Sequence, residues 1–428
     1  MPAYLEGLLA PVPDEIEALD LPVARGALPP ELTGRYFRNG PNPLPGQDPQ
    51  HWFAGHGMIH GVRLRDGRAE WYRNRWTKTR ALAGAPFLGP NGIDRSAVTA
   101  NTHVVRHADR ILALVENGLP YELTPELDTR GPVDFGGKLR TAMTAHPKHD
   151  PTTGDLHFFG YGAMPPYLTY HRLSAAGDLV ESREVTVPGP TMMHDFTITE
   201  HHVIWLDLPV VFDANRLGRG MPYQWDDGYG ARIGVMPRSG GDVRWFDVDP
   251  CYVFHVGNAS EDTDGRVVLD AVRYTPGSFH ATWHGIGGAD TPGDAASGAT
   301  LHRWILDPHS GTVDEQHLDD RRVEFPTMNE DLLGHPSRYR YAAGDDAIVK
   351  YDTETGASLT LPATSPGEAV FVPAAGGTAE DDGWLLSIVG DLAGSELLCV
   401  DARDLTEVAA VTLPRRVPAG FHGNWFAD

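Results

Sequence analysis

Four histidines in this chain lie in surroundings that favour burial: His146, His194, His255 and His422. Each is flanked by apolar, aromatic or small residues, as in the run Met192-Met193-His194-Asp195-Phe196. A buried imidazole needs a hydrogen-bond partner or a metal ion, because leaving its nitrogens unsatisfied costs free energy. An isolated histidine is most often structural, so a metal site requires that the four converge.

The spacing of the four histidines fits one ligand per repeated unit. His146 and His194 are 48 residues apart, His194 and His255 are 61 apart, and His255 and His422 are 167 apart. The first two separations are about one four-stranded propeller blade of roughly 50–60 residues, and the third is about three blades. In a closed propeller, one histidine per blade would meet at the common axis. Four neutral imidazoles without a carboxylate suit divalent Fe, Co, Ni, Cu or Zn, with one or two open positions on an octahedral ion.

Short strand-like runs separated by turns account for most of the chain. It has 48 glycines and 35 prolines spread throughout, and turn sequences such as Asp66-Gly67 and Ser310-Gly311 lie between apolar runs. The predicted strands include Arg110–Val115, Leu156–Tyr161, His202–Leu206, Arg266–Ala271, Leu301–Leu306 and Trp384–Val389. Helical periodicity is sparse, and helical turns are expected only near Asp14–Leu19, Asp94–Val98 and Met328–Leu333.

This pattern predicts an all-β protein. About seven four-stranded units exhaust the chain, which favours a seven-bladed β-propeller, with a stacked β-sandwich as the alternative. No composition break or linker divides the sequence, so residues 1–428 are expected to form a single domain.

Composition and charge exclude several classes of function. With 35 basic and 58 acidic residues the formal net charge is −23, which argues against binding to nucleic acid or to an anionic membrane surface. The chain has no apolar run of membrane-spanning length and no basic segment at its N-terminus, so no stable membrane span and no secretory signal are expected. Two cysteines, Cys251 and Cys399, are too few for a disulfide framework and are expected to be buried. A cytoplasmic location is the simplest expectation.

An ordered set of motifs connects the chain with a known family. The motifs are Gly34–Pro43, His51-Trp52-Phe53, Gly57–Gly61 and Phe421-His422-Gly423, together with the segments around the other three histidines. The chain resembles, nearly end to end, the carotenoid cleavage oxygenases, a superfamily that includes stilbene-cleaving dioxygenases and the retinal isomerase. The resemblance implies a seven-bladed β-propeller with a cap of loops and short helices over a central metal. It also implies that His146, His194, His255 and His422 bind one Fe(2+) per chain.

The same resemblance implies three glutamates that hold the ligand histidines without touching the metal. The matching positions are Glu116, Glu324 and Glu368. A carboxylate that accepts a hydrogen bond from the second ring nitrogen of a histidine fixes its tautomer and orientation and raises its basicity as a ligand. With four histidines and three glutamates, one imidazole is expected to have another partner.

Two positions depart from the family pattern. His56 stands where an aspartate is more usual, and we expect it to be structural, as we do His60, His103 and His107. The stilbene-cleaving branch places a lysine directly before the first glutamate to bind the phenol of its substrate, and Val115 stands there in this chain. A valine side chain cannot donate a hydrogen bond, which favours a more apolar substrate than a 4-hydroxystilbene.

The predicted activity is that of a non-haem Fe(II) dioxygenase that uses O2 to cleave a C=C bond of an apocarotenoid-type conjugated substrate into two carbonyl products. Triplet O2 reacts slowly with a singlet alkene, so a redox-active metal is required, and zinc would not serve. No dinucleotide-binding fingerprint occurs, so no organic cofactor is expected. Cleavage of a stilbene, styrene or phenylpropene side chain is an alternative, as are a non-oxidative isomerase and a non-catalytic, metal-stabilised propeller. The pocket is expected to be apolar and lined by Trp52, Phe53, Val115, Met192, Phe196 and Phe254.

Overall fold

The protein is built almost entirely from antiparallel sheets. Its structure is a computed structural model that describes residues 2–288 and 298–428. Within these residues the strands form seven sheets of four or five strands and two small sheets of two strands. Seven four-stranded units are what the sequence predicts, so the fold class is the seven-bladed β-propeller and the sandwich alternative is wrong.

The chain divides into two compact units. Unit 1 comprises residues 1–133, 327–329 and 338–428, and unit 2 comprises residues 134–326 and 330–337. The expectation that residues 1–428 form a single domain therefore stays a prediction.

Unit 1 contains four of the large sheets and one small one. The strands of each sheet are given in spatial order. The first sheet consists of β1 (Glu17–Leu21), β5 (Arg68–Trp76), β4 (Gly57–Arg65), β3 (Gly34–Pro41) and β34 (Gly423–Ala427). The second sheet consists of β11 (Thr129–Pro132), β10 (Tyr121–Leu123), β9 (Arg110–Leu114) and β8 (His103–His107). The third consists of β2 (Val23–Gly26), β33 (Glu407–Thr412), β32 (Ser395–Asp401), β31 (Gly383–Gly390) and β30 (Val370–Pro373). The fourth contains β27 (Tyr339–Gly344), β28 (Ala347–Asp352) and β29 (Ser358–Pro362), and its first strand, β26 (Val323–Thr327), enters unit 1 only at its last residue. The small sheet is the hairpin β6 (Leu88–Gly89) and β7 (Gly92–Ile93).

Unit 2 contains the other three large sheets. The first consists of β12 (Lys148–His149), β13 (Leu156–Tyr161), β14 (Leu168–Leu173) and β15 (Leu179–Glu184). The second consists of β16 (Phe196–Ile198), β17 (His202–Asp207), β20 (Arg232–Pro237) and β21 (Arg244–Asp247). The third consists of β22 (Tyr252–Glu261), β23 (Val267–Tyr274), β24 (Thr300–Leu306) and β25 (Val313–His317). A hairpin of β18 (Val210–Phe212) and β19 (Tyr223–Trp225) accompanies them. The described helices are α1 (Pro276–Gly285) and the 3-10 helices η1 (Ala3–Leu5), η2 (Gly7–Leu9), η3 (Trp52–Ala54), η4 (Ala214–Arg216) and η5 (Glu330–Leu332). None of the helices in the described ranges is long and apolar enough to cross a membrane.

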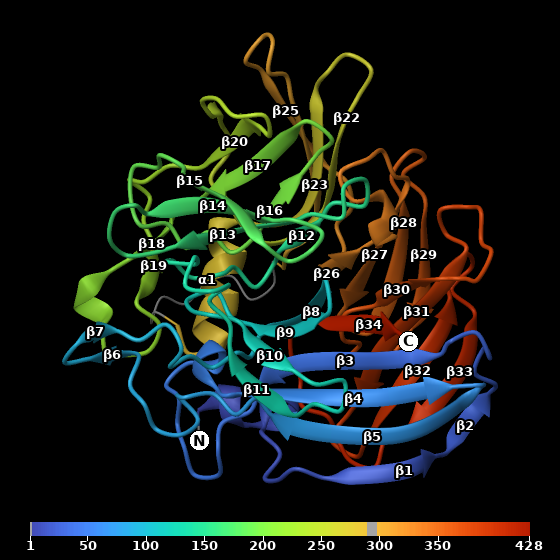
Figure 1. The fold of residues 1–428 in the computed structure, drawn as a ribbon. Coiled ribbons are helices and arrows are strands. Elements are labelled where there is room, and N and C mark those ends of the chain that lie inside the picture. The colour runs from blue at the N-terminus through green and yellow to red at the C-terminus, as the bar shows by residue number, and fades with distance from the viewer. Residues whose placement is uncertain (1, 289–297) are drawn as a thin grey trace. The chain divides into compact units, whose positions relative to one another are not determined.

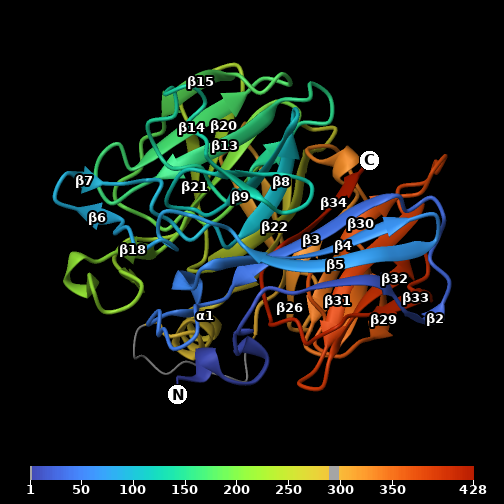
Figure 2. The same ribbon diagram turned by 60° about the horizontal axis from the view of Figure 1, so that its bottom comes forward.

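Strands from the two ends of the sequence complete the same sheets in unit 1. The C-terminal β34 pairs with β3, and β2 pairs with β33, so early and late strands lie side by side (Figures 1 and 2). The buried Arg63 guanidinium forms an ion pair with the carboxylate of Asp428, and Arg35 donates to the same carboxylate at 2.8 Å. Pairing of this kind leaves no free edge on β3. It also fixes the backbone that leads into His422.

The predicted strands are confirmed, and one of the three predicted helical turns, Met328–Leu333, is confirmed by η5. Leu156–Tyr161 coincides with β13, and the other five predicted runs match β9, β17, β23, β24 and β31 to within a few residues. The predicted turn at Asp14–Leu19 is wrong, because β1 begins at Glu17 and pairs with β5. Asp94–Val98 forms a turn in which the Asp94 carboxylate accepts the Ser96 backbone N–H, and η5 is the only helical turn within Met328–Leu333. Both cysteines are buried and unpaired, as predicted.

Four buried histidines outside the predicted site make stability depend on pH. Burial lowers the pKa of His51 and of His157 to about 3, and that of His171 and of His302 to about 4. Their pKa in the unfolded chain is about 6.5, so between the folded and unfolded values the unfolded chain binds more protons. Their contribution to stability is therefore complete above about pH 6.5 and is lost as the pH falls toward 4, at up to about 1.4 kcal/mol per pH unit for each histidine.

We expect the melting temperature of the metal-free protein to fall markedly between pH 7 and pH 5. His171→Gln replaces a ring that lies 2.7 Å from Thr141 Oγ1 and 2.8 Å from Ser182 Oγ, and this variant should show a shallower fall. Differential scanning calorimetry at half-unit pH steps measures both slopes. Equal melting temperatures at pH 7 and pH 5 would contradict the expected protonation.

Candidate metal centre

Three of the four predicted histidines lie together in unit 2. The ring centroid of His255 is 5.2 Å from that of His146 and 5.2 Å from that of His194. The Nε2 atoms of His146 and His194 face one another at 3.0 Å. All three residues are buried, with exposed fractions of 5% for His146, 6% for His194 and 9% for His255. The structure therefore brings together three imidazoles from segments that are far apart in the sequence.

Each of the three histidines lies where the regular pairing of a sheet begins or is interrupted. His146 precedes β12, and its backbone N–H donates to Thr144 Oγ1 at 3.2 Å. His194 precedes β16 and follows an isolated bridge between Thr191 and Val211. His255 lies inside β22, where the pairing with β23 shifts register on both sides of Val256. Bulges of this kind re-aim side chains and are frequent next to active sites.

Glu324 contacts His255, and its role as a support of a metal ligand stays a prediction. Its Oε2 lies 2.5 Å from His255 Nδ1 and also accepts the backbone N–H of Phe325 at 2.6 Å. Its Oε1 accepts the Tyr274 hydroxyl at 2.8 Å, a contact that sequence reasoning missed. Burial alone would raise the pKa of Glu324, but His255 and these hydrogen bonds bring its net pKa below the ordinary value. The charged carboxylate thus fixes the His255 ring through its Nδ1 atom.

The fourth histidine has the same arrangement in unit 1. His422 Nδ1 lies 2.9 Å from Glu368 Oε1, and the Gly423 backbone N–H donates to Glu368 Oε2 at 2.7 Å. Gly423 is required here, because an added Cβ would lie only 2.8 Å from Tyr36 Oη and 2.9 Å from Val370 Cγ2. The His422 ring therefore presents Nε2 as its remaining nitrogen. His103, expected to be structural, has its ring centroid 5.0 Å from that of His422.

Glu116 and Val115 follow β9 in unit 1. Glu116 is half-buried, and its role beside a histidine stays a prediction. Val115 is 8% exposed and belongs to an apolar cluster that includes Phe37, Ile59 and Tyr121. The position where stilbene-cleaving relatives carry lysine is therefore a buried, apolar one.

The predicted aromatic residues of unit 1, Trp52 and Phe53, pack against Phe421, the residue before His422. The ring of Phe421 lies 4.6 Å from Trp52 and 5.3 Å from Phe53, measured between centroids. The predicted pocket lining did not include Phe421, although this residue directly precedes His422 in the Phe421-His422-Gly423 motif. These three rings form an apolar group attached to a candidate ligand.

The predicted apolar residues of unit 2 differ in their surroundings. The Phe254 ring packs edge-on against His194, with centroids 5.1 Å apart. Met192 is buried, and its carbonyl accepts the Tyr252 hydroxyl at 2.7 Å. Phe196 is fully buried and stacks on Trp205 at 5.4 Å, the packing of an ordinary core residue. That these residues line a substrate pocket stays a prediction.

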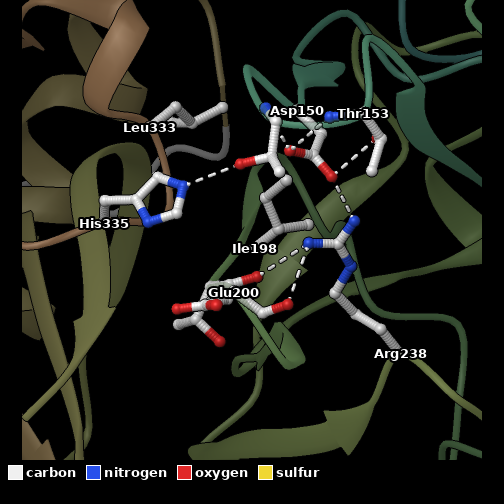
Figure 3. Close-up of a pocket in the computed structure, with 9 residues that line it drawn as sticks. Asp150, Thr153, Ile198, Glu200, Arg238, Leu333 and His335 are labelled. Atoms are coloured by element: carbon white, nitrogen blue, oxygen red, sulfur yellow. Dashed lines mark hydrogen bonds and ion pairs between the residues drawn. The ribbon is translucent and has the colours of Figure 1, made fainter.

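A surface pocket of about 110 Å³ in unit 2 contains none of the predicted site residues (Figure 3). Its Arg238 guanidinium pairs with the Asp150 carboxylate and donates to the carbonyls of Thr199 and Glu200 at 3.1 Å. Asp150 also accepts the Thr153 hydroxyl at 2.8 Å. The polar groups of this pocket form hydrogen bonds and an ion pair with one another. These contacts hold the turn that follows β12 and thereby support the segment that contains His146.

The donor set of unit 2 fits a transition-metal ion. Two nitrogens bound at right angles to one ion at about 2.1 Å would lie about 3 Å apart, which is the separation of the His146 and His194 Nε2 atoms. The donors are neutral imidazoles, a set suited to Fe, Co, Ni, Cu or Zn and poorly suited to Mg or Ca, which prefer oxygen. The carboxylate of Glu324 lies behind His255, on its Nδ1 side.

Comparisons with known proteins agree with this chemistry. The family model described as "Retinal pigment epithelial membrane protein" matches residues 9–427. A carotenoid cleavage oxygenase of Mycobacterium tuberculosis is 42% identical, over 99% of this chain and 97% of its own length. A lignostilbene dioxygenase of Pseudomonas brassicacearum superposes with a TM-score of 0.87 at 28% identity and covers 100% of this chain and 99% of its own. A cobalt-substituted Synechocystis ACO superposes with a TM-score of 0.83 at 30% identity, and the match covers 98% of this chain and 97% of that protein's chain. These full-length matches show that the chain belongs to the carotenoid cleavage oxygenase family and is an alkene-cleaving dioxygenase.

Proposed function

We propose that the protein binds one Fe(2+) through His146, His194 and His255 of unit 2 and His422 of unit 1, and cleaves a C=C bond of an apocarotenoid-type substrate with O2. The observation that carries the proposal is the trio of buried imidazoles, with two Nε2 atoms 3.0 Å apart and a third ring held by a carboxylate. The fourth ligand rests on the match of the Phe421-His422-Gly423 segment to the family and on the Glu368 contact.

The chain's own residues prepare the site for this chemistry. The bound iron would supply the redox-active centre that lets triplet O2 react with a singlet alkene. Glu324 and Glu368 each accept a hydrogen bond from a histidine Nδ1, which leaves Nε2 as the ligand nitrogen. Neutral ligands preserve the full charge of a divalent ion. Phe254 covers one side of His194 and keeps the ring out of water.

The overall reaction balances without any protein acid or base. The two carbons of the C=C bond each receive one oxygen atom of O2, the carbon–carbon bond breaks, and two carbonyl products leave. No proton is added or removed, so the residues around the site need only bind and orient the alkene and exclude water.

Stilbene cleavage is the second candidate for the substrate class. The lignostilbene dioxygenase of Pseudomonas brassicacearum, with its TM-score of 0.87, favours it. The 42% identity to a carotenoid cleavage oxygenase and the apolar Val115 favour an apocarotenoid.

Product analysis of the iron-loaded protein tests the proposed function. The protein is incubated under ¹⁸O2 with a panel of apocarotenals, stilbenes and vinylphenols, and O2 consumption and products are measured. We expect one O2 consumed per alkene and label in both carbonyl products. Geometric isomerisation without O2 uptake would instead support the isomerase, and binding of iron with no reaction on any substrate would support a non-catalytic propeller.

Conversion of Glu324 or Glu368 to Gln should weaken the site without unfolding the protein. The amide keeps the shape of the carboxylate but loses its charge, so the histidine it holds becomes a less basic and less well-fixed ligand. We expect iron affinity or turnover to fall by about 10–100-fold, the usual cost of losing such a contact. Glu116→Gln should act in the same direction.

Glu261→Gln provides the matched control for these variants. Glu261 also holds imidazoles, with His201 Nδ1 at 2.8 Å and His202 Nδ1 at 2.9 Å, but at the far end of β22. Its replacement should leave iron affinity and turnover unchanged. Equal losses in Glu261→Gln and Glu324→Gln would mean that the effect is a general loss of folding stability.

A further inference from the structure

A buried carboxylate connects the three histidine segments of unit 2 with one another. The Asp195 side chain is 2% exposed. Its Oδ1 accepts the backbone N–H of Phe196 at 2.7 Å and lies 2.8 Å from Lys148 Nζ, and its Oδ2 accepts the backbone N–H of Val256 at 2.8 Å. Both carboxylate oxygens are thus engaged by strong donors.

The partners of Asp195 are neighbours of the other two histidines. Lys148 follows His146 by two positions, and Val256 directly follows His255. Asp195 itself directly follows His194. One side chain therefore contacts all three segments, through backbone N–H groups beside His194 and His255 and through the Lys148 ammonium beside His146, although the histidines are 48 and 61 residues apart in sequence.

The backbone around His255 needs such a partner. The register between β22 and β23 shifts between Val253 and Val256 and again between Val256 and Asn258. A bulge disrupts the ladder locally and bends the strand, so its position is set less firmly by the sheet. The Asp195 carboxylate binds the Val256 N–H at the centre of this irregular stretch. The direction of the His255 ring then depends on Asp195 as well as on Glu324.

The Lys148 ammonium compensates the negative charge of the buried Asp195 carboxylate. A buried carboxylate is costly unless it is paired and hydrogen-bonded, and the Lys148 ammonium, whose side chain is 13% exposed, provides the pair. The Lys148–Asp195 pair is neutral, so it orders the segments and leaves the charge near the imidazoles unchanged.

We infer that Asp195 and Lys148 are positioning residues that hold His146, His194 and His255 in their metal-binding arrangement before any ion binds. This inference rests on the proposed function, because it assumes that the three rings are ligands. It adds a connection between the three segments that carry the ligands, whereas Glu324 and Glu368 each contact the ring of one histidine.

Asp195→Ala, Asp195→Asn and Lys148→Met test this inference in the full-length protein. Cobalt(II), added to metal-free protein, serves as the probe, and its affinity is measured by titration alongside the melting temperature. We expect Asp195→Ala to lower cobalt affinity by about 10–100-fold, the range seen for lost supports of metal ligands. Asp195→Asn, which keeps one acceptor for Val256, should lose less and rescue part of the affinity. Lys148→Met keeps all backbone contacts and provides a further variant if Asp195→Ala does not fold.

Asp207→Ala and Asp207→Asn are the matched controls. Asp207 is also a fully buried carboxylate of unit 2, paired with Arg232 at 2.7 Å and bonded by the Tyr229 hydroxyl at 2.8 Å, but it lies on β17 beside no predicted ligand. These variants should lower the melting temperature without changing the cobalt affinity of the folded protein. A loss of affinity in step with the melting temperature in both series would show that Asp195 acts only through stability and would overturn the inference.

Amide hydrogen exchange of the metal-free protein supplies a readout that no metal affects. Loss of the carboxylate acceptor should speed exchange at Val256 by about tenfold or more in Asp195→Ala, and not in Asp207→Ala. Exchange at Val256 as slow as in the parent, with cobalt affinity within about twofold, would overturn the inference. If the parent protein binds neither cobalt nor iron, the proposed function fails, and the exchange rates still decide whether Asp195 holds the segments.

Discussion

Replacement of His194 by Ala is expected to abolish iron binding and alkene cleavage. His194 contributes an Nε2 atom 3.0 Å from that of His146 and lies 5.2 Å from His255 between ring centroids, so its loss removes one of the three donors of the trio. Loss of a supporting contact alone costs about 10–100-fold in metal affinity, and loss of a direct donor should cost more than about 100-fold. Iron content per chain, measured after loading and desalting, and O2 consumption are the two readouts.

His171→Gln is the matched control for His194→Ala. His171 is equally buried in unit 2, but its two ring nitrogens contact the hydroxyls of Thr141 and Ser182. This variant should retain one iron per chain and parental turnover at pH 7. The double variant His194→Ala/His255→Ala should contain no iron. Full metal content and activity in that double variant would show that the ligand assignment is wrong.

The strands could be predicted because their pattern is local. Leu156–Tyr161 is a run of β-forming residues that ends at turn residues on both sides, and it coincides with β13. Asp14–Leu19 contains residues compatible with a helix, yet tertiary contacts decide the outcome. The Asn74 side chain accepts the Ile16 N–H at 2.8 Å, and β1 adds to the edge of β5. Leu19 is 65% exposed, so burial does not determine its conformation.

The one α-helix among the described residues, α1, was not predicted, although its start is encoded locally. The Thr275 hydroxyl accepts the Ser278 backbone N–H at 3.2 Å, and Pro276 occupies the first helical position. Both features are typical of a helix N-terminus. The helix is short and its apolar residues, Phe279 and Trp283, are too few to give a periodic pattern that could be distinguished from the surrounding strands.

Some residues of the candidate site could be predicted from local sequence motifs, whereas others come together only in the folded protein. His255, His422, Glu324 and Glu368 lie in recognisable segments, and the structure places each glutamate on a histidine Nδ1. Tyr274 and Asp195 lie far from Glu324 and Val256 in the sequence, and their contacts depend on how strands and bulges are placed. Tertiary contacts of this kind have no signature in a single sequence.

The identity of residue 115 is expected to decide the substrate class. In the stilbene-cleaving branch a lysine at this position binds a phenol, and here Val115 lies in an apolar cluster at 8% exposure. Two arginines that could have bound the phenol instead are engaged elsewhere. Arg75 donates to the Ile16 carbonyl at 2.8 Å, and Arg80 donates to Asp94 at 3.0 Å. A phenol at this position would therefore lose a charge-assisted hydrogen bond worth roughly 1.5–3 kcal/mol.

We accordingly expect apocarotenals to be cleaved with a kcat/KM at least about tenfold higher than that of 4-hydroxystilbenes, since about 1.4 kcal/mol corresponds to a factor of ten. The comparison is made on the iron-loaded parent protein, with a stilbene lacking the hydroxyl as a matched substrate. If Val115 is the cause, the hydroxyl should give no advantage between the two stilbenes. Val115→Lys should then favour the hydroxylated stilbene, and its melting temperature must be recorded because an ammonium in this cluster is costly to bury. Faster cleavage of 4-hydroxystilbenes by the parent protein would show that residue 115 does not set the preference and that another donor binds the phenol.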